Sequence, residues 1–279
     1  MRIIYICFVG FFLFCQSAQA DPIKAMSFNI RNGMVNDGAN HWDKRKAMLF
    51  EVIRKYSPDV LGLQEAWDFQ IEQMLAALPE YEVVGYGSEG KGVKAGSSRV
   101  FYKKSKFDIQ EVKTFWLSDT PDVPSASWGN SYKRACTQLK LTNKQNRQSF
   151  YVYNTHFDHQ SQQSRLKSAK FMIETMAARR SADPVIFMGD LNAGISSPEI
   201  KHLQENAQLT LVDTHFVVHP KDKNIGTFTA FQFGQFKEKI DYIFVEKGKA
   251  KVSKSIIIRD STNERYPSDH FPIYTEISF

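Results

Sequence analysis

The chain has 279 residues, of which 42% are hydrophobic, 24% charged and 13% aromatic, and its formal net charge is +6. It is too apolar for an intrinsically disordered protein, and 15 glycines with 10 prolines are too few for collagen or a low-complexity linker. Three cysteines cannot build a disulfide scaffold, and the small positive surplus favours anionic partners only weakly. The length fits one large domain or at most two.

The N-terminus has the pattern of a secretory signal peptide. Arg2 provides a positive start, Ile3–Cys15 carries no charge, and Ala18-Gln19-Ala20 places small residues where a signal peptidase reads them. The apolar run of about 13 residues is too short for a transmembrane anchor, which needs roughly 20. We therefore expect a signal peptide over residues 1–20 and a single domain over residues 21–279, in which Cys136 is the only cysteine. This domain is expected to be soluble, monomeric, periplasmic or secreted, and without stable membrane association.

Short apolar runs alternate with longer amphipathic ones along the rest of the chain. No segment resembles an interdomain linker or an internal repeat, so the pattern predicts one α/β sandwich with two sheets. In chain order, the predicted elements are strand Lys24–Ile30, helix Lys44–Tyr56, strand Val60–Gln64, helix Phe69–Leu78, strands Val100–Lys103, Gln138–Leu141 and Phe150–Thr155, helix Ser164–Arg179, strand Val185–Met188, helix Glu199–Ala207, and strands Ile240–Val245 and Ile273–Phe279.

Polar residues follow or begin most of these strands. Each has an ordinary explanation alone, because acids and amides commonly cap helices and turns. Together they predict one polar rim at an edge of the sheets, where α/β folds usually bind ligands. The residues are Asn29, Glu65, Asn154, His156, Asp158, His159, Asp190, Asn192, Asp241, Asp269 and His270.

These residue types suit the metal-assisted hydrolysis of a phosphoester. Carboxylate and amide oxygens are hard ligands that match Mg²⁺ or Mn²⁺ better than zinc. The ion would neutralise phosphate charge, histidines would donate to phosphoryl oxygens, and a carboxylate would take the proton of the attacking water.

Two other hydrolase classes fit less well. A zinc hydrolase on His156, Asp158 and His159 would follow the pattern H-x-H-x-D-H, but Asn154 occupies the place of the first histidine. A Ser-His-Asp hydrolase is disfavoured because the chain has no G-x-S-x-G motif.

The ordered blocks resemble the endonuclease/exonuclease/phosphatase superfamily, also called the deoxyribonuclease I-like family. The resemblance runs from about Ala25 to the C-terminus and implies a four-layer α/β sandwich, with two packed sheets flanked by helices. The blocks are Ser27-Phe28-Asn29-Ile30-Arg31, Leu63-Gln64-Glu65, Asn154-Thr155-His156, Gly189-Asp190-Leu191-Asn192, Ile240-Asp241-Tyr242 and Ser268-Asp269-His270-Phe271-Pro272.

The resemblance also implies roles for single residues. Glu65 would be the principal metal ligand, helped by Asn29 and Asp269. Asp190 would activate or orient the attacking water, and Asn192 would hold the phosphate or the nucleophile. His156 and His270 would donate to the scissile phosphate, and Asp241 would fix His270.

Within the superfamily, the run Asn154-Thr155-His156-Phe157-Asp158-His159 is similar to a bacterial secreted branch with the motif N-T-H-F-D-H. Arg31, Arg134, Arg165 and His159 are candidate phosphate-binding residues, because guanidinium groups grip phosphate in a bidentate manner. Surface ion pairing is the alternative reading for the arginines.

Three functions remain open from the sequence. The first is a secreted phosphomonoesterase or phosphodiesterase for a small or glycan-borne phosphoester, the second is a secreted nuclease for DNA or RNA, and the third is a non-catalytic binding module. The unbroken motifs disfavour the third. The substrate would be set by the loops Gly85–Ser98, Thr120–Tyr132 and Val217–Phe236, where Trp128, Tyr132 and several phenylalanines form either an aromatic wall or part of the core.

Overall fold

The computed structural model describes residues 21–93, 96 and 98–279, so the predicted signal peptide lies outside the described residues. The first sheet has six strands, and only its β1–β2 pair is parallel. Its strands, in spatial order, are β11 (Lys251–Ile257), β12 (Ile273–Ser278), β1 (Ile23–Asn29), β2 (Val60–Gln64), β4 (Val100–Lys103) and β3 (Tyr81–Val84).

The second sheet repeats this plan. It also has six strands, and only its β7–β8 pair is parallel. Its strands, in spatial order, are β5 (Phe107–Trp116), β6 (Ala135–Asn143), β7 (Ser149–His156), β8 (Val185–Asp190), β10 (Asp241–Glu246) and β9 (Leu211–Asp213).

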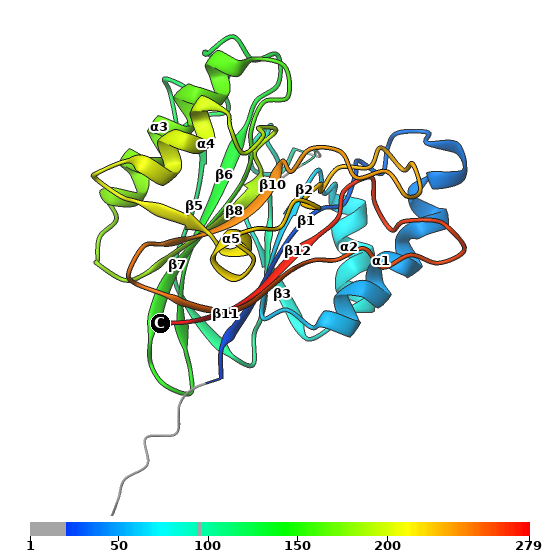
Figure 1. Ribbon diagram of the computed structural model, residues 1–279, viewed down its shortest axis with the longest axis horizontal. Coiled ribbons are helices and arrows are strands. Elements are labelled where there is room, and N and C mark those ends of the chain that lie inside the picture. The colour runs from blue at the N-terminus through cyan, green and yellow to red at the C-terminus, as the bar shows by residue number, and fades with distance from the viewer. Residues whose placement is uncertain (1–20, 94–95, 97) are drawn as a thin grey trace, which may run out of the picture.

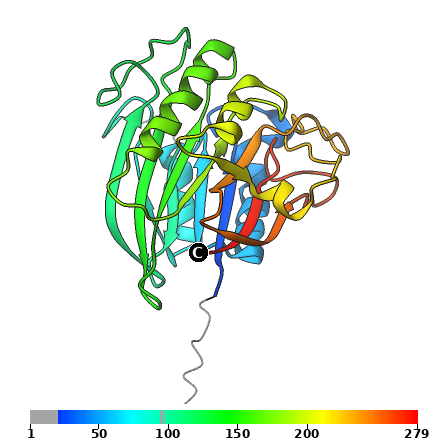
Figure 2. The same cartoon turned by 60° about the vertical axis from the view of Figure 1, so that its left-hand side comes forward.

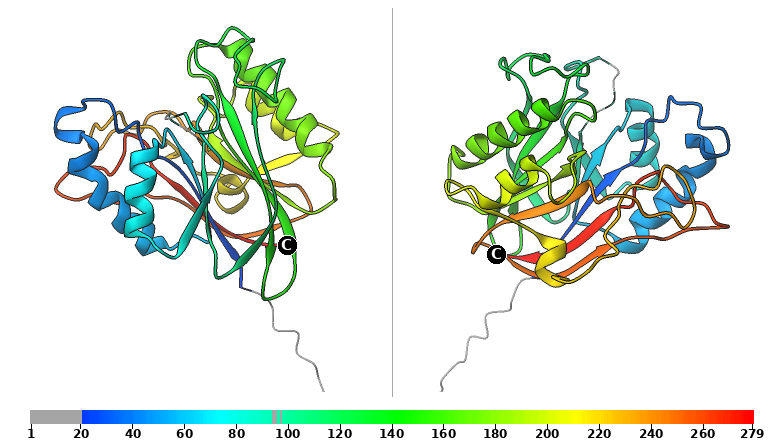
Figure 3. Two further views of the ribbon diagram at one scale, coloured as in Figure 1. Left: turned by 180° about the vertical axis from the view of Figure 1, so that it is seen from behind. Right: turned by 45° about the horizontal axis from the view of Figure 1, so that its top comes forward.

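Helices cover the outer face of each sheet and complete four layers (Figures 1 and 3). Helices α1 (Trp42–Tyr56) and α2 (Asp68–Ala77) lie on the first sheet, and α3 (Gln162–Ala177) and α4 (Pro198–Glu205) lie on the second. A short helix α5 (Thr214–Val218) and a 3₁₀ turn (Gly38–Asn40) complete the described elements. None of the helices in this part of the chain is long and apolar enough to cross a membrane. The predicted four-layer α/β sandwich is therefore confirmed.

Three apolar clusters match the interfaces between these layers. One joins α1 and α2 to the first sheet, one joins α3 and α4 to the second, and the third fills the space between the sheets. The lone Cys136 and also Trp128 are buried in the second cluster. Trp128 packs edge-on against Phe171, so it belongs to the core and not to an aromatic wall at the site.

Hydrogen bonds from Asn154 join the two sheets through their centre. From β7, its Nδ2 atom donates to the backbone oxygens of Leu63 at 2.8 Å and Arg99 at 2.9 Å, and its Oδ1 atom accepts from Gln64 at 2.7 Å. A methyl group on Gly62 would approach Asn154 Oδ1 to 2.7 Å, so glycine permits this close contact. The residue that replaces the first histidine of the zinc pattern is thus a structural link between the sheets.

The predicted helices and long strands are present, and Val60–Gln64 and Val100–Lys103 have the predicted bounds. The elements that the apolar pattern missed are β3, β5, β9, β11 and α5. Two of them, β5 and β11, carry many exposed polar side chains and contain a register irregularity, so neither forms a continuous apolar run. Strand β11 lies at the edge of its sheet.

We expect Asn154→Ala to lower the free energy of unfolding by about 3–5 kcal/mol, because it leaves several buried polar groups unpaired at roughly 1–3 kcal/mol each. At this chain size, that loss corresponds to a fall in Tm of roughly 6–20 °C. Thermal denaturation against an exposed control, Asn36→Ala, measures the effect. Equal melting temperatures for the two variants would contradict the role of Asn154.

Candidate active site

The two parallel strand pairs end at the same edge of the sandwich and deliver the central polar side chains there. Asn29 ends β1, and Glu65 directly follows β2. His156 and Asp190 end β7 and β8 and are paired in register. Asp241, the first residue of antiparallel β10, pairs with Asp190 from the other side. Strand register therefore places these five residues.

Several site residues adopt left-handed backbone conformations. The φ angles are 58° at Arg31, 60° at Glu65 and 48° at Asn192, and residues other than glycine adopt such values infrequently. Gly189 precedes the central acid, where an added Cβ atom would lie only 2.0 Å from the backbone oxygen of Thr155. Local strain of this kind is concentrated at functional sites.

The carboxyl group of Asp190 lies at the centre of the site and is almost fully buried. Its Oδ2 atom accepts from Asn29 Nδ2 at 2.9 Å and lies 3.3 Å from His156 Nε2, while its Oδ1 atom accepts from the backbone of Asn192 at 3.0 Å. Burial, followed by the negative charge of Asp241, raises the pKa of Asp190 to about 7. A carboxyl group with such a pKa can exchange a proton near neutral pH.

His270 is paired with the acid that the sequence assigned to it. Its Nδ1 atom lies 2.9 Å from Asp241 Oδ2, and its Nε2 atom faces Asp190 Oδ2 at 3.8 Å. Burial alone would lower the pKa of His270, but the carboxylates of Asp241 and Asp190 more than offset it and hold that pKa well above the usual value. The site therefore favours an imidazolium that donates from Nε2.

His156 has the opposite charge preference. Burial and the positive charges of Arg134 and His270 hold the pKa of His156 well below its usual value. Its Nε2 atom lies 2.9 Å from Asn192 Nδ2, which also donates to the backbone oxygen of Phe157 at 3.0 Å. The surroundings of the two histidines therefore shift their pKa values in opposite directions.

Glu65 and Asp269 provide the hard oxygen ligands expected for a divalent cation. Both side chains line the same pocket. The pKa of Asp269 is raised, mainly by burial, and the negative charge of Glu65 contributes to the increase through charge repulsion. A cation between them would remove this repulsion, so the donor set fits Mg²⁺ or Mn²⁺. The ligand atoms of Asp190, Asp241 and His270 also lie within 4.8 Å of one another, but the His270–Asp241 hydrogen bond already accounts for that cluster.

Asn29 links two acids of the site. Its Nδ2 atom donates to Glu65 Oε1 at 3.1 Å as well as to Asp190, and its Oδ1 atom accepts from the backbone of Arg31 at 3.0 Å. In this orientation the amide presents hydrogen to the acids, and its oxygen keeps one lone pair beyond the bond from Arg31. Asn29 therefore holds Glu65 and Asp190 together in this structure, and its ligand role stays a prediction of the resemblance.

The candidate phosphate-binding residues divide into two groups. Arg31, Arg134 and His159 line the pocket that contains the site. Arg165 does not: its Nε atom pairs with the buried Glu199 at 2.7 Å, and its Nη1 atom donates to the backbone oxygen of Asp158 at 3.0 Å. We expected Arg165 to bind phosphate, and the structure corrects this, because both contacts tie helix α3 to α4 and to the loop after β7.

The side chain of Asp158, part of the alternative zinc pattern, has a structural role. Its Oδ1 atom accepts from the backbone nitrogens of Gln160 at 3.0 Å and Ser161 at 2.7 Å, and its Oδ2 atom lies 3.7 Å from Arg134 Nε. Asp158 therefore stabilises the turn before α3 and holds Arg134, which extends along the pocket wall.

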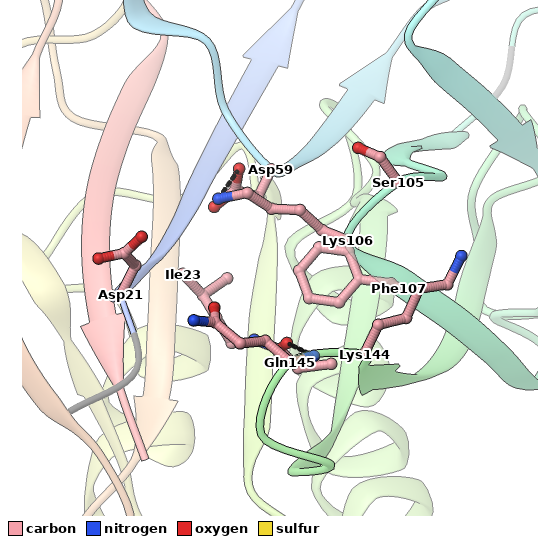
Figure 4. Close-up of a pocket in the computed structure, with 9 residues that line it drawn as sticks. Asp21, Ile23, Asp59, Ser105, Lys106, Phe107, Lys144 and Gln145 are labelled. Carbon is pink, nitrogen blue, oxygen red and sulfur yellow. Dashed lines mark hydrogen bonds and ion pairs between the residues drawn. The ribbon is translucent and has the colours of Figure 1, made fainter. Parts of the chain in front are cut away.

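The pocket over the site has a volume of about 590 Å³. A second cavity of about 320 Å³ lies at the opposite edge, beside the first residues of β1, β2 and β5 (Figure 4). There, the buried carboxylate of Asp59 is already paired with Lys106 at 3.0 Å and accepts from the backbone of Lys24 at 3.1 Å. The buried acid of this cavity is thus already paired, and the cluster of acids and histidines described above lies in the larger pocket.

A buried lysine and a buried arginine support the site, and the sequence did not single them out as supports. Lys239 has a fully buried ammonium group that pairs with Asp213 at 2.9 Å and donates to the backbone oxygen of Asp241 at 2.8 Å. Arg45 donates to the backbone oxygens of Ile30 at 2.7 Å and Pro267 at 2.9 Å. Lys239 directly precedes the block Ile240-Asp241-Tyr242, which was the available signal, but burial cannot be read from that position.

Carboxylates and histidines with shifted pKa values, together with arginines in one pocket, characterise enzymes that hydrolyse phosphoesters. The model of the endonuclease/exonuclease/phosphatase family matches residues 26–270, and the chain therefore belongs to this family. Family membership indicates phosphoester hydrolase activity, and the family is generally dependent on divalent metals.

Solved structures agree with this assignment. A mannosyl-6-phosphatase from Bacteroides thetaiotaomicron superimposes with a TM-score of 0.85 at 31% identity, covering 92% of this chain and 100% of that one. A family protein from Bacteroides vulgatus gives a TM-score of 0.83 at 27% identity, covering 93% and 99% of the two chains. The human nocturnin catalytic domain gives 0.75 at 20% identity, covering 94% and 95%, and that likeness shows the fold alone.

We expect Lys239→Met to lower the free energy of unfolding by about 3–5 kcal/mol, because it leaves the Asp213 carboxylate buried and unpaired. The double variant Lys239→Met/Asp213→Leu should recover most of that stability, since an apolar pair can replace a buried ion pair. The kcat of the double variant should still fall about tenfold, because Asp241 loses the donor at its backbone oxygen, while its KM changes little.

Urea unfolding measures the stability changes, and steady-state kinetics measures kcat and KM. A double variant with normal kcat would show that Lys239 has a structural role only.

Proposed function

We propose that the protein is an exported phosphoester hydrolase that uses Mg²⁺ or Mn²⁺ and acts on a small or glycan-borne phosphomonoester. The observation that carries the proposal is the position of Asp190 Oδ2, which lies 3.3 Å from His156 Nε2 and 3.8 Å from His270 Nε2. The similarity to a mannosyl-6-phosphatase supports a sugar phosphate as the substrate. Export rests on the N-terminal sequence pattern, and a monomeric state is part of the same proposal.

Each side chain of the site has its own role in the proposed reaction. Asp190 accepts the proton of the attacking water, because its raised pKa makes it a base near neutral pH. His270 donates from Nε2 to a phosphoryl oxygen, where its charge stabilises the negative charge of the transition state. Asn192 orients the water or the phosphate beside His156.

Positive groups in the pocket favour a doubly charged monoester. Arg134 is largely buried and lines the same pocket as Asp190 and Glu65, so its guanidinium group is available to a phosphate bound there. Arg31 is partly exposed and is held by two hydrogen bonds of 3.0 Å to Asp37. Glu65 and Asp269 would hold a divalent ion, which would supply further neutralisation of phosphate charge.

We expect Asp190→Asn to lower kcat for mannose 6-phosphate with Mg²⁺ by about 10²–10⁴-fold, the range for the loss of a general base. Glu65→Gln should also abolish most turnover. The exposed residues Asp122 and Glu51 provide matched controls, Asp122→Asn and Glu51→Gln, which should retain activity. Turnover above a tenth of normal in Asp190→Asn would contradict the mechanism.

The unmodified protein and the same variants also distinguish phosphomonoesterase activity from nuclease activity. Degradation of plasmid DNA or RNA that weakens steeply with added salt, with no release of phosphate from monoesters, would replace the proposed function by nuclease activity.

Metal binding should be visible without turnover. A ligand that binds only the folded state at 100 times its Kd stabilises that state by about 2.7 kcal/mol. At this chain size, we therefore expect saturating Mg²⁺ or Mn²⁺ to raise the Tm by roughly 5–10 °C. Glu65→Gln should lose most of this shift, whereas Glu51→Gln should retain it. Equal shifts in all three proteins would argue against a metal site at Glu65.

A further inference from the structure

One wall of the main pocket leads from the buried floor to solvent. His156 at the floor is 9% exposed, and the side chain of Arg134 above it is 13% exposed. His159 is exposed and contributes to the electrostatic environment of His156, and Tyr132 at the rim is 58% exposed. All four residues line the same pocket. A phosphoester whose phosphate binds near His156 therefore has space for its organic group toward Tyr132.

The aromatic ring at the rim is held by its neighbours although it is exposed. Tyr132 and His159 have ring centroids 5.7 Å apart, and His159 Nδ1 lies 3.1 Å from Arg134 Nη2. The guanidinium carbon of Arg134 lies 6.0 Å from the centre of the Tyr132 ring. Binding a ligand against Tyr132 would bury aromatic surface that now faces water. Because the contacts with His159 and Arg134 already restrict the ring, it loses less conformational entropy on binding.

The rest of the rim combines another aromatic residue with polar groups. Trp67 lies between the end of β2 and the start of α2, is half-buried, and lines the same pocket. Ser88 and the ion pair between Glu89 and Lys133 also line it. Hydroxyl, carboxylate and ammonium groups can all exchange hydrogen bonds with a ligand that carries several hydroxyl groups.

We propose that the outer part of the pocket is a sugar-ring subsite with Tyr132 as its platform, so that the substrate is a hexose phosphomonoester. This inference rests on the proposed function and names the residue that selects the substrate. A pyranose presents an apolar face of C–H groups to an aromatic ring and hydroxyl groups around its edge, and the rim offers partners for both. The pocket volume of about 590 Å³ is within the usual range for small-ligand sites, so it has space for a sugar beyond the phosphate.

Binding to an inactive variant tests the subsite separately from catalysis. In Asp190→Asn with Mg²⁺, calorimetry gives the Kd values of inorganic phosphate and mannose 6-phosphate. We expect the sugar phosphate to bind at least tenfold more tightly than phosphate. Adding Tyr132→Ala should reduce this ratio by about fivefold, which is the usual size of an aromatic contact. Tyr132→Phe, which keeps the ring, should retain most of the ratio.

Turnover provides the second readout and the matched control. With the active-site residues intact, Tyr132→Ala should lower kcat/KM for mannose 6-phosphate about fivefold more than kcat/KM for glycerol 3-phosphate, which has no ring. Val123 lies on the same loop, is 54% exposed and does not line the pocket, so Val123→Ala should behave like the unmodified protein.

The outcomes separate this inference from the proposed function. A Kd ratio unchanged by Tyr132→Ala, or no binding of mannose 6-phosphate, overturns the sugar subsite even if other phosphoesters are hydrolysed. A larger effect of Tyr132→Ala on adenosine monophosphate than on mannose 6-phosphate overturns the substrate class in favour of nucleotides. An unmodified protein that binds mannose 6-phosphate through Tyr132 but releases no phosphate supports the subsite and contradicts the proposed function.

Discussion

The hydrogen bonds of Asn154 are the constraint on which the site depends. One amide from β7 bonds to Gln64 and to the backbones of Leu63 and Arg99, and these three partners belong to the first sheet or to the segment that leads into it. Apolar packing between two sheets permits small sliding, whereas directional hydrogen bonds in a dry interior resist it. Glu65 lies one residue beyond Gln64, and His156 lies two residues beyond Asn154. The same amide therefore sets the distance between the acid of one sheet and the histidine of the other.

The environment of each group, more than its residue type, determines its chemistry. The pKa values of the two histidines near Asp190 are shifted in opposite directions. Burial, with the positive charges of Arg134 and His270, lowers the pKa of His156, whereas the carboxylates of Asp241 and Asp190 outweigh burial and raise the pKa of His270. Such separation of pKa values is how one pocket can hold a donor and an acceptor together. The buried Lys239 does not line the pocket, and it holds the backbone of Asp241 from behind the site.

Sequence patterns predicted the parts of the structure that depend on local chemistry. Strands such as β2 and β8 are buried along their whole length, so their apolar runs and the polar residues that follow them are visible in the sequence. Strands β5 and β11 have exposed faces and resemble loops. The direction of a long side chain depends on its tertiary partners. For this reason Arg165 was expected in the pocket, although it pairs with Glu199, and the amide orientation of Asn29 could not be predicted.

The pairing of β1 with β12 has a consequence for the order of events during synthesis. These strands are adjacent in the first sheet, although they lie near opposite ends of the described chain (Figure 2). Ser268, just before β12, donates to the backbone oxygen of Asn29 at 2.7 Å and so connects the two segments beside the site. A ribosome must therefore release the whole stretch from β1 to His270 before His270 can meet Asp190. Catalytic competence would then appear late and abruptly, and partly synthesised chains would be inert.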